Sequence, residues 1–303
     1  MYPCSWGNSS YWRLGWVMII LISIGIIILA PLVGGLLTGV DRVISARLQG
    51  RQGPPVLQPF YDVLKLINKE SIEVNSMHRF FVYISLIFVA FTTVILLSGG
   101  DILLAIFALT LGSIFFVLGG YASNSPYSTI GSERELLQIM AYEPMVLLTC
   151  VALYYTNGSF FIHDIISADK PAIIFLPGVF LGLLFILAFK LRKSPFDLSM
   201  SHHGHQEIVK GITTEYSGRD LAVIEITHWY EVIITLTLVY VFFASSTPVS
   251  HVVAVVACLL TYFLEIIIDN AMARLKWQQA FVSSWLVTGI LASLNLFILS
   301  VIK

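Results

Sequence analysis

The sequence predicts an all-α polytopic membrane protein with eight transmembrane helices, on the grounds of its composition and its hydropathy pattern. Of the 303 residues, 57% are apolar and only 12% are charged, and the mean hydropathy is +0.86. A soluble globular protein has about 25% charged residues. Apolar segments long enough to cross a bilayer occur at 14–39, 80–98, 102–121, 136–156, 171–190, 226–245, 249–270 and 282–302. We expect them to form a single membrane domain over 1–303.

The first apolar segment is expected to be a membrane span and not a cleaved signal peptide. A short polar stretch with aromatic residues precedes it, and it lacks both a basic leading segment and a small-residue cleavage site.

The basic residues predict the orientation of the helices, because Lys and Arg accumulate on the cytoplasmic side of membranes. If both termini lie outside, every Lys and Arg except Arg13, Lys170 and Lys303 falls on an inner connection. Only two connections are then long, at about 41–79 and about 191–224, and both are cytoplasmic. Long connections of this kind usually carry function. The pattern favours a multi-pass protein of a prokaryotic plasma membrane.

Charge and cysteine content exclude several kinds of site. A net charge of −1 argues against nucleic acid as a partner, because binding phosphates requires an excess of Lys and Arg. Cys4, Cys150 and Cys258 lie too far apart in the sequence to form a local set of zinc or iron–sulfur ligands. We therefore expect no metal, cofactor or catalytic residue in this chain itself. No internal repeat of the secondary-transporter type is evident.

The first long connection is expected to contain an amphipathic helix. Gly53-Pro54-Pro55 interrupts the chain, and Leu57, Tyr61 and Leu64 then follow at helical spacing. Such a helix lies along the membrane surface, where it either anchors the fold or docks a partner.

The second long connection carries three closely spaced histidines beside Glu207, namely His202, His203 and His205. Imidazole suits zinc, nickel and iron, but consecutive histidines point to different faces of a helix or strand. The cluster therefore either binds a metal or serves as a protonatable or interface-forming surface.

Several ionisable residues fall inside or at the ends of the expected spans, where an unpaired charge costs free energy and usually marks function. Glu143 lies within the fourth span. Glu225, His228 and Glu231 follow at i, i+3, i+6 in the sixth, so that in a helix they form a slanting stripe able to pass a proton.

Two further pairs of carboxylates have predicted helical spacings. Glu265 and Asp269 are four residues apart near the cytoplasmic end of the seventh span, and Glu207 and Glu215 would share a face of a helix in the second connection. A structural alternative is that Glu225 and Asp269 lie at the membrane surface and pair with Arg219 and Arg274.

Three motifs carry a resemblance to a known family. The run RLQGRQGPPVLQPFYDVLKLINKE, the segment SPFDL and the segment SHHGHQEIVKGITTEYSG resemble the membrane subunit shared by respiratory complex I, where it is subunit 1, and the membrane-bound nickel-iron hydrogenases. The short GPPVLQP and the His-rich SHHGHQE resemble the corresponding membrane subunit of the Ech-type energy-converting hydrogenases. Complex I usually has an acidic ExExEL segment where this chain has Ser201, His203 and His205.

The resemblance implies roles for particular residues. The motifs YE, PFDL, QEIVKG and TEY place the family's inner carboxylates at Glu143, Asp197, Glu207 and Glu215, which would lead from the redox module into the ion path. Together with the stripe in the sixth span, the expected ion-pathway residues are Glu143, Asp197, Glu207, Glu215, Glu225, His228 and Glu231. The expected partner-docking residues are Asp41, Arg42, Arg51, Asp62, Lys65, Glu70, Arg134, Glu135, His202, His203 and His205.

The resemblance also implies partners. Hydrogenase large and small subunits with a nickel-iron centre and [4Fe–4S] clusters would bind the cytoplasmic face, reduced ferredoxin would supply electrons, and antiporter-like membrane subunits would complete translocation of protons or sodium. Two alternatives remain open at this stage. One is a quinone-site subunit of a complex I-like dehydrogenase, with Phe60, Tyr61, Phe80 and Phe81 near the quinone, and the other is a stand-alone cation/proton antiporter.

Overall fold

The computed structural model describes residues 9–72, 75–199, 208–273 and 275–302, and over these residues it is all-helical, with no strand. The helices are α1 (Ser9–Leu48), α2 (Gln58–Ile67), α3 (Ser76–Leu97), α4 (Ile102–Ala122), α5 (Pro126–Asn157), α6 (Ile162–Ile166), α7 (Pro177–Lys190), α8 (Gly218–Phe243), α9 (Pro248–Ala271), α10 (Trp277–Val287) and α11 (Ser293–Ile302). A 3-10 turn, Ala172–Ile174, precedes α7, and a π-helical segment, Thr288–Ala292, joins α10 to α11.

Seven helices in the described part of the chain are long and apolar enough to cross a membrane, which confirms the predicted membrane class. The expected span at 171–190 forms only α7, a helix of 14 residues. At 1.5 Å per residue this helix is about 21 Å long, less than the roughly 30 Å hydrocarbon core of a bilayer. The count of eight spans therefore stays a prediction.

Three helices begin or end beyond the limits that hydropathy predicts, because hydrophobic windows stop at the first charges whereas the backbone continues. Helix α1 runs on to Leu48 and therefore carries Asp41 and Arg42, which the sequence pattern assigns to a loop. Helix α5 begins at Pro126, at the first helical position that suits proline, and so includes Glu135. Helix α8 begins at Gly218.

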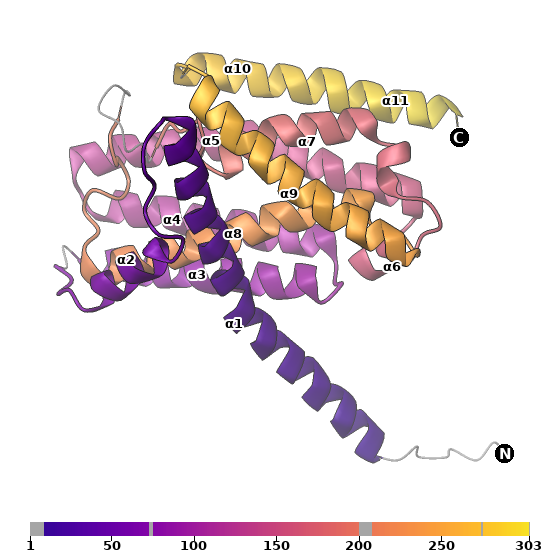
Figure 1. Ribbon diagram of the computed structural model, residues 1–303, viewed down its shortest axis with the longest axis horizontal. Coiled ribbons are helices and arrows are strands. Elements are labelled where there is room, and N and C mark those ends of the chain that lie inside the picture. The colour runs from indigo at the N-terminus through magenta and orange to yellow at the C-terminus, as the bar shows by residue number, and fades with distance from the viewer. Residues whose placement is uncertain (1–8, 73–74, 200–207, 274, 303) are drawn as a thin grey trace.

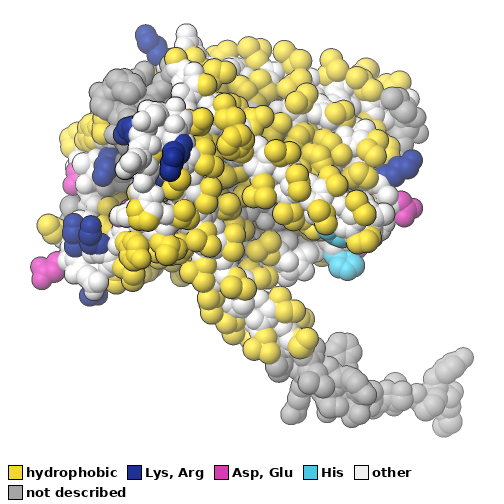
Figure 2. All heavy atoms as spheres, viewed as in Figure 1, with side chains coloured by type: hydrophobic (Ala, Val, Ile, Leu, Met, Phe, Trp, Pro, Cys, Tyr) yellow, Lys and Arg dark blue, Asp and Glu magenta, His cyan; other side chains and the backbone are white. Residues whose placement is uncertain are grey.

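The long helices form a bundle whose two ends differ (Figure 1). Helix α2 and the connections 49–57 and 191–217 lie at one end, which we call the loop end, and the described ends of α1 and α11 nearest the termini lie toward the other. Figure 2 shows a broad hydrophobic surface on the visible face, with Lys and Arg side chains gathered mainly toward the loop end. The one-sided charge matches the sequence pattern; the assignment of this end to the cytoplasm stays a prediction.

The amphipathic helix expected in the first connection is confirmed as α2. Pro59 and Val63 are buried on its inner face, and the ring of Phe60 lies 5.0 Å from that of Trp229 on α8. Tyr61 and Leu64 are more than half exposed. An exposed apolar face at one end of a membrane bundle suits a position in the bilayer interface.

Helix α8 lies at the centre of the packing and contacts α1, α2, α3 and α9. Gly34 of α1 allows the closest approach, because a Cβ atom there would overlap the backbone carbonyl of Trp229. Small residues allow membrane helices to pack closely in this way. The N-terminal half of α1 projects away from the bundle, as Figure 1 shows, and Met18 to Ile22 are all more than half exposed.

The predicted orientation can be tested with single cysteines at the two ends of the bundle. Gln52 and Asp169 are exposed, and we expect only Asp169→Cys to react with a membrane-impermeant thiol reagent in intact cells. Gln52→Cys is expected to react only in inverted vesicles. The background chain would lack Cys4, Cys150 and Cys258, and the reverse labelling pattern would contradict the orientation.

Candidate functional site

Three cations at the end of α7 are directed to different helices of the bundle. Lys190 is the last residue of α7, and Arg192 and Lys193 follow at once. Arg192 adopts a left-handed backbone conformation (φ 52°), which turns the chain sharply after the helix. Lys190 and Lys193 are buried, and only 15% of the Arg192 side chain is exposed.

Arg192 lies between carboxylates of two helices. Its Nη2 atom is 3.2 Å from Oε1 of Glu135 on α5 and 3.8 Å from Oε2 of Glu231 on α8. Its guanidinium group also lies 5.4 Å from the centre of the Phe116 ring. Burial by itself would lower the pKa of Arg192, but Glu135 and Glu231 raise it above its ordinary value. The guanidinium therefore stays charged inside the protein.

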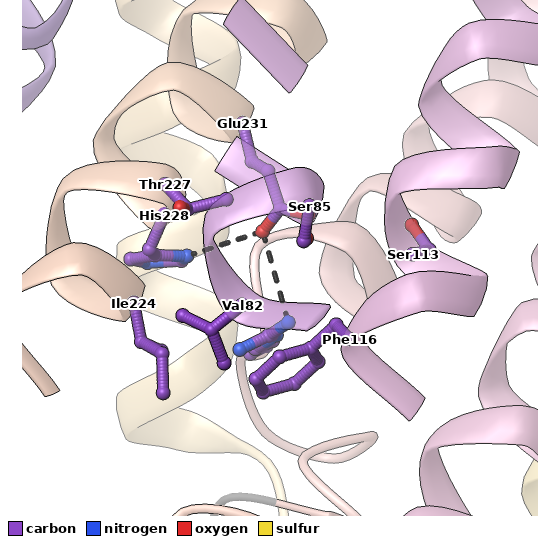
Figure 3. Close-up of a pocket in the computed structure, with 9 residues that line it drawn as sticks. Val82, Ser85, Ser113, Phe116, Ile224, Thr227, His228 and Glu231 are labelled. Carbon is purple, nitrogen blue, oxygen red and sulfur yellow. Dashed lines mark ion pairs between the residues drawn. The ribbon is translucent and has the colours of Figure 1, made fainter. Parts of the chain in front are cut away.

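Glu231 is the centre of this arrangement, because three basic groups approach one carboxylate whose side chain is 8% exposed. Besides Arg192, Nζ of Lys190 lies 3.9 Å from Oε1 and Nδ1 of His228 lies 3.7 Å from Oε2. Figure 3 shows the His228 and Glu231 side chains pointing toward each other. Lys190 also donates a hydrogen bond of 3.0 Å to the Tyr142 hydroxyl. We call Glu135, Tyr142, Lys190, Arg192, His228 and Glu231 the Glu231 cluster.

A small cavity lies beside this cluster, between α3, α4 and α8. Its volume is about 20 Å³, and Ser85, Ser113, Thr227, His228 and Glu231 contribute polar atoms to its lining. This is room for about one water molecule, and the site has enough polar partners to hold one. A water there would extend the hydrogen-bonding path from Glu231 toward α3 and α4.

Glu143 faces a second cavity of about 20 Å³ in the interior of the bundle. Lys190, Tyr142, Thr110 and Thr235 line the same cavity. Lys190 thus connects the two parts of the site, since it approaches Glu231 and also borders the space beside Glu143. Ionisable groups therefore follow one another from Glu135 at the loop end through Arg192, Glu231 and Lys190 to Glu143.

Glu135 is fixed in place from the second connection. The Ser199 hydroxyl donates to one oxygen of Glu135 and, at 3.0 Å, to Oε1 of Gln138, so the segment that follows α7 is held against α5. A partner bound to this segment would be one short connection away from the buried carboxylate.

The remaining expected ion-pathway residues lie around this cluster. Asp197 is half-buried and interacts electrostatically with Arg192. Glu225 is half-buried on α8, which confirms that Glu225, His228 and Glu231 share one helix. Glu215 lies in a turn before α8, so the expected helix around it is wrong; the backbone there turns from Lys210, which has φ 51°. Glu207 lies outside the described residues.

The expected docking residues fall into two groups. Arg51, Lys65 and Glu70 are exposed near the loop end. The others that the structure describes are engaged within the chain: Asp41 with Lys193 at 2.7 Å, Arg42 with Asp62 at 2.7 Å, Arg134 over the Trp277 ring at 4.7 Å, and Glu135 with Arg192. His202, His203 and His205 lie outside the described residues. The docking role stays a prediction for all of them.

The pair of Arg42 and Asp62 joins α1 to α2. Burial raises the pKa of Asp62, but hydrogen bonds from Arg42 (2.7 Å) and Gln58 (2.9 Å) outweigh that effect and leave the pKa below its ordinary value. The carboxylate is therefore ionised at neutral pH and fixes α2 against the end of α1.

Sequence reasoning missed Lys190, Arg192 and Tyr142 as members of the site. In the sequence pattern the two cations mark only the cytoplasmic side. The available signal was the placement of three cations within four residues directly after an apolar helix. Within the described ranges, no group of three or more His, Cys, Asp or Glu side chains is arranged to hold a metal ion.

Comparison with known proteins places the chain in a family. Residues 19–300 match the family described as NADH dehydrogenase. The H-type subunit 2 of NADH-quinone oxidoreductase from Geobacter sulfurreducens is 28% identical over 292 residues, which cover 85% of this chain and 88% of that protein. From Escherichia coli K12, hydrogenase-4 component C is 27% identical (83% and 87% covered) and formate hydrogenlyase subunit 4 is 26% identical (80% and 87% covered).

The fold is also found in a solved structure. A chain of the membrane-bound sulfane sulfur reductase, an archaeal respiratory membrane complex, superimposes with a TM-score of 0.83 at 24% identity, covering 93% of this chain and 99% of that one. The family resemblance inferred from the loop motifs is confirmed. This multi-pass membrane protein belongs to the NADH dehydrogenase subunit 1 family, which also includes relatives named as hydrogenase-4 and formate hydrogenlyase subunits.

Proposed function

We propose that this chain is the coupling subunit of an energy-converting nickel-iron hydrogenase, in which ferredoxin-driven proton reduction in partner subunits moves ions across the membrane. The observation that carries the proposal is the continuous run of ionisable groups from Glu135 through Arg192, Glu231 and Lys190 to the cavity beside Glu143. Buried charges are costly in a membrane and are generally retained for function.

The geometry suggests how a signal at the loop end reaches Glu143. Arg192 is closer to Glu135 (3.2 Å) than to Glu231 (3.8 Å), and Lys190 is closer to Tyr142 (3.0 Å) than to Glu231 (3.9 Å). Glu231 therefore competes with a second partner for each cation. Movement of the segment after α7 would change this sharing, and a displaced Lys190 would alter the charge beside Glu143.

The expected redox groups belong to partners. A nickel-iron centre and [4Fe–4S] clusters would reside in the hydrogenase large and small subunits at the loop end, and antiporter-like subunits would extend the ion path. The relatives named as hydrogenase-4 component C and formate hydrogenlyase subunit 4 support this choice of complex. The exposed residues Arg51, Lys65 and Glu70 offer charged contacts for such subunits.

The test replaces Glu143 by Gln in the whole complex. We expect dye-coupled hydrogenase activity to persist and the ion gradient in inverted vesicles to be lost, because an amide cannot carry a proton or bind a cation by charge. The matched control is Glu133→Gln, an exposed position on the same helix, which is expected to retain both activities. A gradient that persists in Glu143→Gln would contradict the proposal.

A second candidate is a quinone-reducing complex, which the relative from the NADH-quinone oxidoreductase of Geobacter sulfurreducens favours. An apolar groove of about 380 Å³ lies between α1, α3 and α8, lined by Ile22, Gly25, Ile26, Leu29, Ala30, Val33, Leu97 and Ile233, and is large enough for part of a prenyl chain. Purification of the complex separates the two candidates. Nickel with iron and hydrogen evolution supports the hydrogenase, whereas iron without nickel and co-purifying quinone supports the alternative.

A further inference from the structure

A second group of ionisable residues lies between α1 and α9. It consists of Asp41, Lys193, Tyr262, Glu265 and Asp269, and we call it the Glu265 cluster. Its members differ from those of the Glu231 cluster, but Lys193 directly follows Arg192 in the chain, so the same short segment contributes to both.

Glu265 is the unusual member of this cluster. It is 1% exposed, and neither of its carboxylate oxygens has a hydrogen-bond partner among the described residues. An ionised carboxylate in such a position would lose its hydration without a compensating hydrogen bond, and this costs several kcal/mol in proteins. The carboxyl group is therefore best accommodated with its proton bound.

The surroundings of Glu265 provide a positive charge that is already engaged elsewhere. Lys193 Nζ lies 2.7 Å from Oδ2 of Asp41 on α1 and 5.5 Å from the centre of the Tyr262 ring, one turn before Glu265 on α9. Lys193 and Asp269 both interact electrostatically with Glu265. Lys193 can thus stabilise a second carboxylate if the proton leaves Glu265.

Asp269 connects Glu265 to the loop end. It lies four residues further along α9, on the same face of the helix, and its Oδ1 accepts a hydrogen bond of 2.8 Å from the backbone of Ser194. Asp269 also lines an open polar cavity of about 370 Å³ between α1 and α9, together with Arg42, Ser45 and Asn270. A cavity of this size and polarity holds water.

We propose that Glu265 is a proton-carrying carboxyl group, reached from the loop end through the α1/α9 cavity and Asp269. In the release step, the O–H bond of Glu265 breaks and its electron pair stays on the carboxylate beside Lys193. The proton passes to the carboxylate of Asp269 and from there to water in the cavity. Reloading is the reverse of these transfers. The path therefore differs from the one through Glu231, which enters between α3, α5 and α8.

The use of this path for ion movement rests on the proposed coupling function, but the protonation of Glu265 can be measured without it. Infrared difference spectra of the purified complex between neutral and alkaline pH report protonated carboxyl groups, whose C=O stretch is separate from that of carboxylates. We expect one such band to disappear in Glu265→Gln and to remain in Asp164→Asn, an exposed carboxylate at the opposite end of the bundle. A band unchanged in Glu265→Gln overturns the proposal.

The second measurement is the ion gradient formed by the same complexes in vesicles. Gln is a neutral isostere of protonated Glu, so Glu265→Gln is expected to assemble normally while losing the gradient, and Glu265→Asp is expected to restore part of it. Loss of the band together with a full gradient would overturn the carrying role. A failure of the coupling function itself is detected separately, as a gradient that persists in Glu143→Gln.

Discussion

Replacement of Arg192 by Gln is expected to destabilise the protein by about 3 to 5 kcal/mol, because removing one partner of a buried ion pair leaves an uncompensated charge. Arg192 is the partner of Glu135 and Glu231, which are 7% and 8% exposed at their side chains. The measurement is the midpoint of thermal unfolding of the complex in detergent. The control is Arg42→Gln, whose ion pair with Asp62 is 40% and 37% exposed and is worth at most about 1 kcal/mol.

A double variant distinguishes loss of charge balance from loss of packing. Arg192→Gln combined with Glu231→Gln is expected to be more stable than Arg192→Gln alone, because the second change removes one of the buried carboxylates left without its partner. If the two changes simply add, the destabilisation comes from packing of the Arg192 side chain and the electrostatic account of the Glu231 cluster is wrong.

Replacement of Gly34 by Ala is the packing change with the largest expected effect. A Cβ atom at this position would overlap the backbone carbonyl of Trp229, and a backbone atom of a central helix cannot move aside cheaply. Inserting a carbon into a closely packed contact costs about 1–3 kcal/mol and sometimes more. We expect a lower thermal midpoint and a lower yield of assembled complex.

Helix α1 supplies its own control for this prediction. At Gly25 an added Cβ would meet nothing within 4 Å, so Gly25→Ala changes the same residue type on the same helix without a steric conflict. It is expected to leave stability unchanged or slightly improved, because Ala favours helix more than Gly does. Equal losses in the two variants would show that helix flexibility, and not the α1/α8 contact, is what the glycines provide.

The fold class and most of the helices could be predicted from hydropathy, because an apolar segment in a membrane must form a helix to satisfy its backbone. The exact limits could not. Helices α5 and α8 continue through charged residues that a hydrophobic window excludes, and α7 is shorter than the apolar segment that contains it. The helix expected around Glu215 does not form, because local turn geometry prevails there.

The candidate site was predictable in its carboxylates but not in its pairing. Glu143 and Glu231 were conspicuous as charges in apolar segments. Their relation to Lys190 and Arg192 depends on how α5, α7 and α8 pack, and this is tertiary information that spacing in one sequence does not contain. Glu135 illustrates the difference, since its position in a polar connection suggested a surface contact, whereas α5 carries it into the protein beside Arg192.

The sharp turn after α7 has a thermodynamic consequence. Because Arg192 and Lys193 are neighbours in the chain but lie in different clusters, a displacement of this segment changes the electrostatic environment of both Glu231 and Glu265. Such coupling is reciprocal. If a protein that binds residues 191–199 alters the proton affinity of either carboxyl group, then loading or unloading that proton must change the affinity for the bound protein by the same factor.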